Sequence, residues 1–463
     1  MSDTSSIERI LKEEKINTWD IYVEEAEEYE IQLRNFDVEV TRGPIKNSGY
    51  AVRVIRPKRN KVVGIGIGTG SSLEAARIRK CLDTASVGAD ITHFPGYALP
   101  RPEKYPSVRI ADPKIVSKAE TVVKDKTEEL LSLLKESKKV LPTFGKIRTY
   151  NVSTTIANSE GLQAEKKETF FYIELALKAE REGKLAEYWP MIPTRRAEDV
   201  HLDQLVPKWT RLAEDTLSAK VPKTEKTTVI FTPQTLSEIL PDTVGFHSFG
   251  SSVYKGVSKF KRGEKIASDE LTVYDEGVHD YALGSSPFDD EGVPQSKTLL
   301  IEDGIHKNFL YDAMYAAALD AYSTGNGLKL PAFSLAFTRV DSKYSLLPST
   351  QPTNTAVKAG GMSLNEMIAD TKEGIYVEQF SSLSSDSLTT SFGSEIRNAY
   401  LIEKGQLSTP LKGGQISGFV LDSQSGKADG LLSRVSGMTD EVQMAGRCIA
   451  PYMRFSGIQV AGR

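Results

Sequence analysis

The sequence predicts an α+β protein, in which an N-terminal antiparallel sheet with helices on one face precedes a β-dominated C-terminal domain. Three observations carry this prediction. Residues 19–67 contain runs of alternating apolar and polar side chains. Segments with helical spacing of apolar residues follow at 71–89 and 113–137. Residues 333–463 are rich in Gly, Ser and Thr and hold short alternating runs such as GIYVEQF.

The predicted elements of the first half follow from periodicity and turn residues. Residues 5–16 predict an amphipathic helix, and residues 19–40 predict a hairpin whose acidic side chains face water. Residues 49–55 and 61–67 flank the polar turn RPKRN and predict a second hairpin. The segment 92–112 is rich in proline and is expected to be irregular. The remaining predictions are helices at 71–89, 113–137 (with Pro113 at its start) and 201–219, and strands near 146–157, 168–180 and 184–191.

A chain of 463 residues is too long for one ordinary core, so we expect two domains. The Lys-rich segment KVPKTEKTT marks the boundary, giving domains at 1–222 and 223–463. Beyond it, VIFTP predicts a strand and residues 233–240 predict a short helix that Pro241 interrupts. Residues 274–327 predict a strand, an acidic turn, a second strand, a helix and a tight Gly/Asn turn.

Composition bounds the function. The formal net charge of -4, from 58 basic and 62 acidic residues, gives no reason to expect direct binding to nucleic acid or to an acidic membrane. No apolar run reaches 18 residues, and the N-terminus lacks the pattern of a secretory signal. The two cysteines, Cys81 and Cys448, are too few for a disulfide framework and fit a reducing cytoplasm.

Four glycines at alternate positions, Gly64, Gly66, Gly68 and Gly70, lie between a predicted strand and a predicted helix. Their spacing matches neither GxGxxG nor the P-loop, so the pattern does not predict a phosphate site. Alternation places all four on one face of a strand, and we expect another element to approach that face closely.

The catalytic motifs we sought are missing from the sequence. No two of the five histidines lie closer than 27 residues, so no zinc-binding pair sits on one helix turn. There is no GxSxG, and Cys81 and Cys448 lie among apolar residues, as small buried side chains do. The acidic cluster Asp289, Asp290 and Glu291 could bind a cation or a peptide amine. The favoured interpretation is a turn whose carboxylates accept backbone N–H bonds, with Gly292 at a positive φ.

The block SPFDDEGVPQSKTLLIEDG, followed by the turn STGNG, resembles the signature region of the TldD/PmbA family, also called modulators of DNA gyrase. The segments SGYAVRVI, GEKIASDELTVYDEG and PTNTAVKAGGMSLNEMI are similar to further blocks of the family, in the same order. The resemblance implies that the signature residues serve peptide or partner binding or a structural role. They are Asp289, Asp290, Glu291, Gly292, Gly325 and Asn326.

The TldD branch of the family resembles zinc metallopeptidases and carries HExxxH on a helix, whereas the TldE/PmbA branch lacks that motif. Aligning this chain on SSVYKG places Thr235 and Leu240 at the histidine positions and Leu236 at the glutamate position. Leucine can neither ligate zinc nor act as a base. Glu238 is the only acid of that helix, and Pro241 is expected to break it. The resemblance thus implies a TldE/PmbA-type subunit with no catalytic residue and no metal of its own.

The resemblance also implies partners. We expect a TldD-type metallopeptidase subunit that carries the zinc, in a heterodimer, or else a homodimer, acting on unfolded peptides in the cytoplasm. An extended peptide could add a strand to an exposed sheet edge. Two alternatives stay open. One is a metallopeptidase with a replaced metal site built from His247, His279 or the turn at residues 289–291. The other is a regulatory protein that acts through protein–protein contacts.

Overall fold

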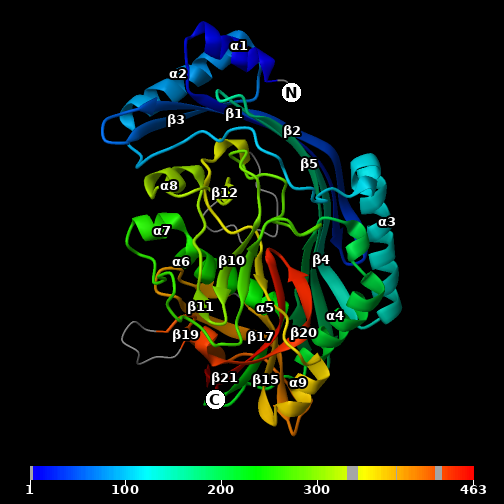
Figure 1. Ribbon diagram of the computed structural model, residues 1–463. Coiled ribbons are helices and arrows are strands. Elements are labelled where there is room, and N and C mark those ends of the chain that lie inside the picture. The colour runs from blue at the N-terminus through cyan, green and yellow to red at the C-terminus, as the bar shows by residue number, and fades with distance from the viewer. Residues whose placement is uncertain (1–3, 331–342, 382, 423–429) are drawn as a thin grey trace.

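The computed structural model describes residues 4–330, 343–381, 383–422 and 430–463 (Figure 1). It confirms the predicted α+β class, with an N-terminal antiparallel sheet backed by helices and a strand-rich C-terminal half. The predicted β-rich region begins at residue 333, and its residues 333–342 lie outside the described part. No helix in the described ranges is long and apolar enough to cross a membrane.

The first sheet contains seven strands in the described residues, paired antiparallel in the order β3-β2-β1-β4-β5-β6, with β7 also on β5. Both predicted hairpins, β1–β2 and β2–β3, are confirmed, and β2 is one long strand shared by them. The strands are β1 (Trp19–Arg34), β2 (Asp37–Pro57), β3 (Val63–Gly70), β4 (Val140–Asn158), β5 (Gln163–Arg181), β6 (Lys184–Tyr188) and β7 (Met191–Thr194).

Four helices cover the outer face of this curved sheet (Figure 1). Helices α1 (Ser5–Glu13) and α2 (Ala75–Ile91) pack on β1 and β2. Helices α3 (Pro113–Ser137) and α4 (Leu202–Thr216) pack on β1, β4, β5 and β6. The bounds of α3 match the prediction, because Asp112 caps its first turn by accepting from Lys114 N, and proline suits the first helical position.

The glycine run of β3 confirms the predicted close approach. A Cβ on Gly66 would lie 1.8 Å from Ala85 O, and one on Gly68 would lie 2.0 Å from Cys81 O. Both oxygens belong to the backbone of α2, so the helix lies directly on the strand. Glycine is needed at these positions because any side chain would push the helix off the sheet.

The second half of the chain forms a large mixed sheet, which lies on the side of the inner face of the first sheet (Figure 1). Its strand order is β11-β10-β9-β14-β21-β19-β17-β15-β8, with β16 and β18 on β17 and β20 on β21. Two strands, β12 and β13, pair separately. The strands are β8 (Glu225–Phe231), β9 (Val273–Glu276), β10 (Lys297–Glu302), β11 (Ile305–His306), β12 (Gly327–Leu328), β13 (Ser349–Thr350), β14 (Thr355–Val357), β15 (Glu373–Phe380), β16 (Ser384–Ser385), β17 (Ser391–Glu403), β18 (Gln406–Leu411), β19 (Gln415–Phe419), β20 (Val435–Ala445) and β21 (Cys448–Ala461).

Short helices connect these strands. They are α5 (Pro233–Ser237), α6 (Phe246–Ser248), α7 (Gly250–Tyr254), α8 (Ala313–Ala318) and α9 (Leu364–Asp370), with a π-helical turn at Pro241–Gly245. The predicted order of strand, acidic turn, strand, helix and tight turn over residues 274–327 is confirmed. The boundary between residues 222 and 223 stays a prediction, since the two sheets alone do not define separately folding units.

Two local predictions are wrong. The acids of β1 were expected to face water, yet Glu24 and Glu30 are only 2% and 1% exposed. Glu30 pairs with Arg148 on β4, and Tyr22 on the same face contacts Phe288 from the C-terminal half. Pro241 does not end the helical path, because it begins a new π-helical turn, where the missing N–H is not required.

The packing of α2 on β3 can be tested with Gly66→Ala. The methyl group would meet the Ala85 carbonyl oxygen, so we expect the free energy of unfolding to fall by roughly 2 kcal/mol. Urea denaturation measures this loss. Gly361→Ala is the matched control, because nothing lies within 4 Å of its added Cβ, and a change of at most about 0.5 kcal/mol is expected there. Equal effects in the two variants would contradict the proposed role of Gly66.

Candidate functional site

Helix α5 and the turn after it hold Thr235, Leu236 and Leu240, the positions that we predicted to correspond to HExxxH. Thr232 caps the helix by accepting a hydrogen bond from Thr235 N at 3.3 Å, and Pro233 occupies the first turn. The Thr235 hydroxyl donates back to Thr232 O at 2.8 Å. Leu236 and Leu240 are 0% and 1% exposed and belong to the main core of the second half.

These side chains do not fit a zinc ion. Thr235 is fully buried with its hydroxyl committed to the helix cap, and the two leucines offer no donor atom. No group of three or more His, Cys, Asp and Glu side chains suited to a metal occurs within the described ranges. The helix that would carry the ligands is therefore used here for packing.

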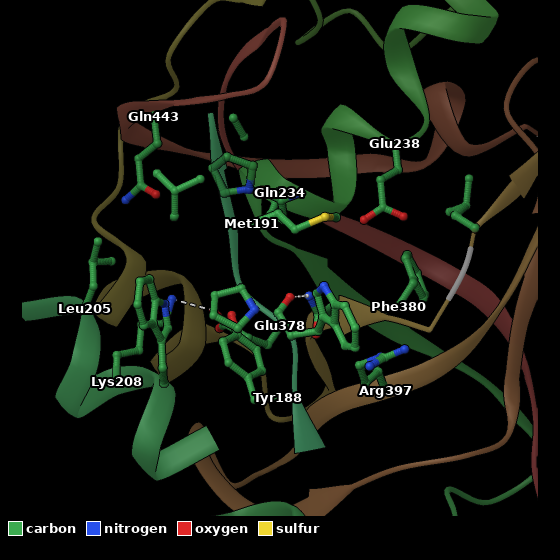
Figure 2. Close-up of a pocket in the computed structure, with 18 of the residues that line it drawn as sticks. Tyr188, Met191, Leu205, Lys208, Gln234, Glu238, Glu378, Phe380, Arg397 and Gln443 are labelled. Carbon is green, nitrogen blue, oxygen red and sulfur yellow. Dashed lines mark hydrogen bonds and ion pairs between the residues drawn. The ribbon is translucent and has the colours of Figure 1, made fainter. Parts of the chain in front are cut away.

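A pocket of about 590 Å³ opens beside α5, between the two halves of the chain (Figure 2). The first half contributes residues 188–192, which join β6 to β7, and one face of α4. The second half contributes α5, the end of β15, Arg397 from β17 and residues 443–445 from β20. Two tryptophans, Trp189 and Trp209, are among the apolar side chains of its lining.

Among the residues that the structure describes, two contacts join the halves at this pocket. Lys208 on α4 forms an ion pair with Glu378 on β15, and Gln379 Nε2 donates to Trp189 O at 2.7 Å. Burial alone would lower the pKa of Lys208, but the charge of Glu378 and the hydrogen bond to it raise the pKa. Lys208 is therefore charged and already paired with Glu378. This ion pair and the Gln379–Trp189 hydrogen bond hold the two walls of the pocket together.

Glu238 is the acid that α5 presents to the pocket (Figure 2). Burial raises its pKa to about 7, against the opposing effects of the Leu383 backbone N–H and the charge of Arg397. A carboxyl group with this pKa holds its proton for much of the time at neutral pH. Such a group can donate a hydrogen bond or exchange a proton with a bound molecule.

The signature residues form a second cluster, buried between the two sheets and apart from the pocket lining. Asp289 accepts the backbone N–H groups of Glu291 and Val293 at 2.9 Å each and that of Gly327 at 2.8 Å. Gly292 has a φ of 91°, as expected for this turn. The carboxylate thus ties the acidic turn to the STGNG turn, at the start of β12.

Asp290 is surrounded by three lysine residues, two of which face it with their ammonium groups. Its carboxylate lies 2.9 Å from Lys343 Nζ, accepts Lys329 N at 2.8 Å and lies 3.8 Å from Lys166 Nζ. Burial alone would raise the pKa of Asp290, but the two ammonium groups of Lys343 and Lys166 hold it well below its usual range. Asp290 is therefore ionised and neutralised within the protein.

Glu291 connects this turn to the first sheet. Arg53 on β2 lies 3.3 Å from Glu291 Oε1 through Nη1, and its Nε lies 2.9 Å from both oxygens of Asp20. Tyr97 donates to Glu291 at 3.1 Å, and Ala313 N, at the start of α8, donates to its other oxygen at 2.8 Å. Arg53 is 4% exposed, so the whole pair is buried.

The STGNG turn is fixed in the same way. Gly325 has a φ of 75°, and a Cβ there would lie 2.4 Å from Pro294 O. Asn326 donates from Nδ2 to Asp275 Oδ2 at 2.8 Å and to Gln351 O at 2.9 Å. The structure thus gathers the six signature residues into one buried network, and none of them lines the pocket.

A family model described as the PmbA/TldA metallopeptidase C-terminal domain matches residues 224–462, which is more than half of the chain. The chain belongs to the TldD/PmbA family. A metalloprotease of Methanocaldococcus jannaschii is 32% identical over 50% of this chain and 47% of its own length. A metalloprotease TldD homologue of Haemophilus influenzae is 34% identical over 37% of this chain and 33% of its own length. This chain therefore spans about half or less of these curated relatives.

The solved structure of TldE from Thermococcus kodakarensis shares the fold. It superimposes with a TM-score of 0.84, covers 99% of this chain and 100% of its own, and is 21% identical. This likeness concerns the fold alone. Together with the family model, it confirms the fold class and the family predicted from the signature block.

The histidines considered as replacement ligands do not converge in this TldD/PmbA-family chain. His247 is 0% exposed, accepts Lys259 N through Nδ1 at 3.1 Å, and has its pKa lowered to about 4 by burial. His279 is exposed and lies against the Asp280 carbonyl. Neither belongs to a metal-binding group in the part of the chain that the structure describes.

Sequence reasoning missed several of the charged side chains described above, among them Lys208, Glu378, Arg397 and Arg53. Lys208, Glu378 and Arg397 lie in no motif and meet only through the tertiary fold. Arg53 did carry a signal, because it is the charged residue in the run AVRVI, whose members are all buried. A charge within such a run indicates a buried ion pair.

The buried Arg53 pair can be tested with Arg53→Met. The change leaves the carboxylates of Asp20 and Glu291 buried without a cation, so we expect a loss of about 3–5 kcal/mol in the free energy of unfolding. Arg9→Met is the control, since the Arg9 side chain is 66% exposed and its pair with Glu13 should contribute less than about 1 kcal/mol. A loss at Arg53 as small as that at Arg9 would disprove the role of the pair.

The raised pKa of Glu238 predicts a pH dependence of stability. Between its ordinary pKa of about 4.3 and about 7, the folded chain holds a proton that the unfolded chain releases. The free energy of unfolding should therefore fall as pH rises from 5 to 8, by on the order of 3 kcal/mol. Denaturation curves of Glu238→Gln should lack this component, whereas those of the exposed control Glu187→Gln should keep it. A wild-type slope that survives in Glu238→Gln would contradict the prediction.

Proposed function

We propose that this chain is a TldE/PmbA-type, non-catalytic subunit of a two-protein zinc metallopeptidase. The observation that carries the proposal is the use of the HExxxH positions for packing: Thr235, Leu236 and Leu240 are buried, and none can bind zinc or activate water. Membership of a metallopeptidase-related family supports the reaction class of the complex. The zinc and the base that activates water are then supplied by a TldD-type partner.

The pocket beside α5 is the part of this chain that we assign to peptide binding. It occupies the place next to the helix where a catalytic relative would carry its motif, and its lining is rich in apolar side chains. The neighbouring strand β20 pairs with β21 on one side, and its Val442 and Met444 are 44% and 50% exposed. Its other edge is bridged to Met362 at Thr439, so an unfolded peptide could pair through its backbone with the part of β20 that follows, at residues 441–445, which explains how many sequences would be accepted.

The two alternatives have less support. A replaced metal site needs ligands that converge, and the histidines and the turn at residues 289–291 lie apart, with the turn's carboxylates already paired. A regulatory role through protein–protein contacts has no observation of its own in the fold. The formal net charge of -4 does not favour direct binding to DNA.

A reconstitution experiment tests the proposal. The purified chain alone should contain no stoichiometric zinc and should not hydrolyse an unfolded peptide such as reduced, denatured casein. Mixing it with a TldD-type protein should give hydrolysis, while the same partner with the HExxxH glutamate changed to glutamine should give none. Light scattering during size-exclusion chromatography distinguishes a heterodimer from a homodimer. Robust hydrolysis by the lone, metal-free chain would refute the proposal.

A further inference from the structure

The pocket contains a cation that no carboxylate neutralises. Arg397 is half-buried, and its one hydrogen bond within the described ranges is a long one, from Nη2 to Ser381 O at 3.4 Å. No carboxylate of the described residues lies within 4 Å of its guanidinium group. Lys208, the other cation of the lining, is already paired with Glu378. Arg397 therefore retains most of its donors for a bound anion.

Glu238 adds a second group suited to the same anion. Figure 2 shows Glu238 entering the pocket from α5 and Arg397 from β17, on the same side of the pocket, near Phe380. Burial raises the pKa of Glu238 to about 7, so near neutral pH its carboxyl group can carry a proton. A protonated carboxyl donates a hydrogen bond to a carboxylate, whereas an ionised one repels it.

Apolar side chains make up a large part of the lining. Trp189, Met191, Phe380 and Leu383 are among them, and the volume of about 590 Å³ exceeds that of a single side chain. A pocket with a large apolar lining, one unpaired arginine and one acid that can hold a proton near neutral pH suits a molecule with an apolar body and a single carboxylate at its end. The terminal residue of a peptide chain has this chemistry.

We propose that the pocket binds the C-terminal residue of a peptide, with Arg397 pairing with the α-carboxylate and the aromatic wall holding its apolar side chain. The inference rests on the proposed function in one respect, which is that the ligand is a peptide. An internal stretch of peptide backbone has no charge and would leave the half-buried Arg397 without an anion. Pairing between guanidinium and carboxylate is bidentate in its best geometry, so it selects for the chain end.

Intrinsic fluorescence provides the readout, since two of the chain's three tryptophans, Trp189 and Trp209, line the pocket. The full chain is titrated, without any partner, with three synthetic hexapeptides of one unstructured sequence. The first ends in leucine with a free carboxylate, the second is its C-terminal amide, and the third is an amide that ends in glutamate. We expect the free acid to bind at least tenfold more tightly than either amide.

Variants assign the difference to the named side chains. Arg397→Gln should bring the affinity for the free acid down to that for the amide, while Arg181→Gln, which removes an exposed arginine on β5, should change nothing. Raising the pH from 6 to 8.5 should weaken binding of the free acid to the wild type, because Glu238 ionises. Glu238→Gln should remove that weakening. The other titratable or charged groups of the lining are Tyr188, Lys208, Glu378 and Arg397. Burial raises the pKa of Tyr188 well above its ordinary value, and the charge of Glu378 raises the pKa of Lys208 against the effect of burial.

Three results would overturn the proposal. They are equal binding of the free acid and its amide, tight binding of the glutamate amide, and unchanged binding in Arg397→Gln. The comparison of acid with amide uses the wild type, so it stands even if a variant does not fold. Because no partner or hydrolysis is involved, failure here leaves the reconstitution experiment intact, and failure of reconstitution leaves peptide binding measurable.

Discussion

The buried guanidinium of Arg53 is the interaction on which the arrangement of the two halves depends. It holds Asp20 within the first sheet and Glu291 within the signature turn, and Glu291 also accepts the first N–H of α8. Removing three ionic groups from water is costly, and the cost is offset only when every partner is in place. The network is therefore satisfied in only one relative position of the first sheet and the signature turn. Its main effect is to specify that position, and its net contribution to the free energy of folding is smaller.

The same logic extends along the interface. Arg195, which is 1% exposed, pairs with Glu168 on β5 and donates to the Leu283 and Ser285 carbonyls of the loop before the signature turn. Lys166 donates to Phe288 O and Lys343 pairs with Asp290. The pocket is a consequence of this docking, because Lys208 and Trp189 come from one half and Glu378 and Gln379 from the other. A peptide in the pocket would contact both halves at once.

Much of the fold was predictable because its signals are local. Pro113 and the 3.6-residue period of apolar side chains predicted the bounds of helix α3. The alternate glycines in β3 predicted that another element, which is α2, approaches this strand closely. The failures have a common cause. Alternation in β1 identifies a polar face, but it cannot tell whether a second layer covers it, so Glu24 and Glu30 were placed in water. For the candidate site, sequence located α5 and Glu238 but not the cations that face them, which are distant in the chain.

The sequence by itself determined the family and the fold class, since these depend on residue identity and short-range order. It also placed the signature acids on a turn, with Gly292 at the position that needs a positive φ. Only the tertiary structure decided that this turn is buried and joins the two halves through ion pairs, and that the pocket opens beside α5. The physical reason is that burial and ion pairing are properties of surfaces brought together by folding, and no local pattern records which surface will meet which.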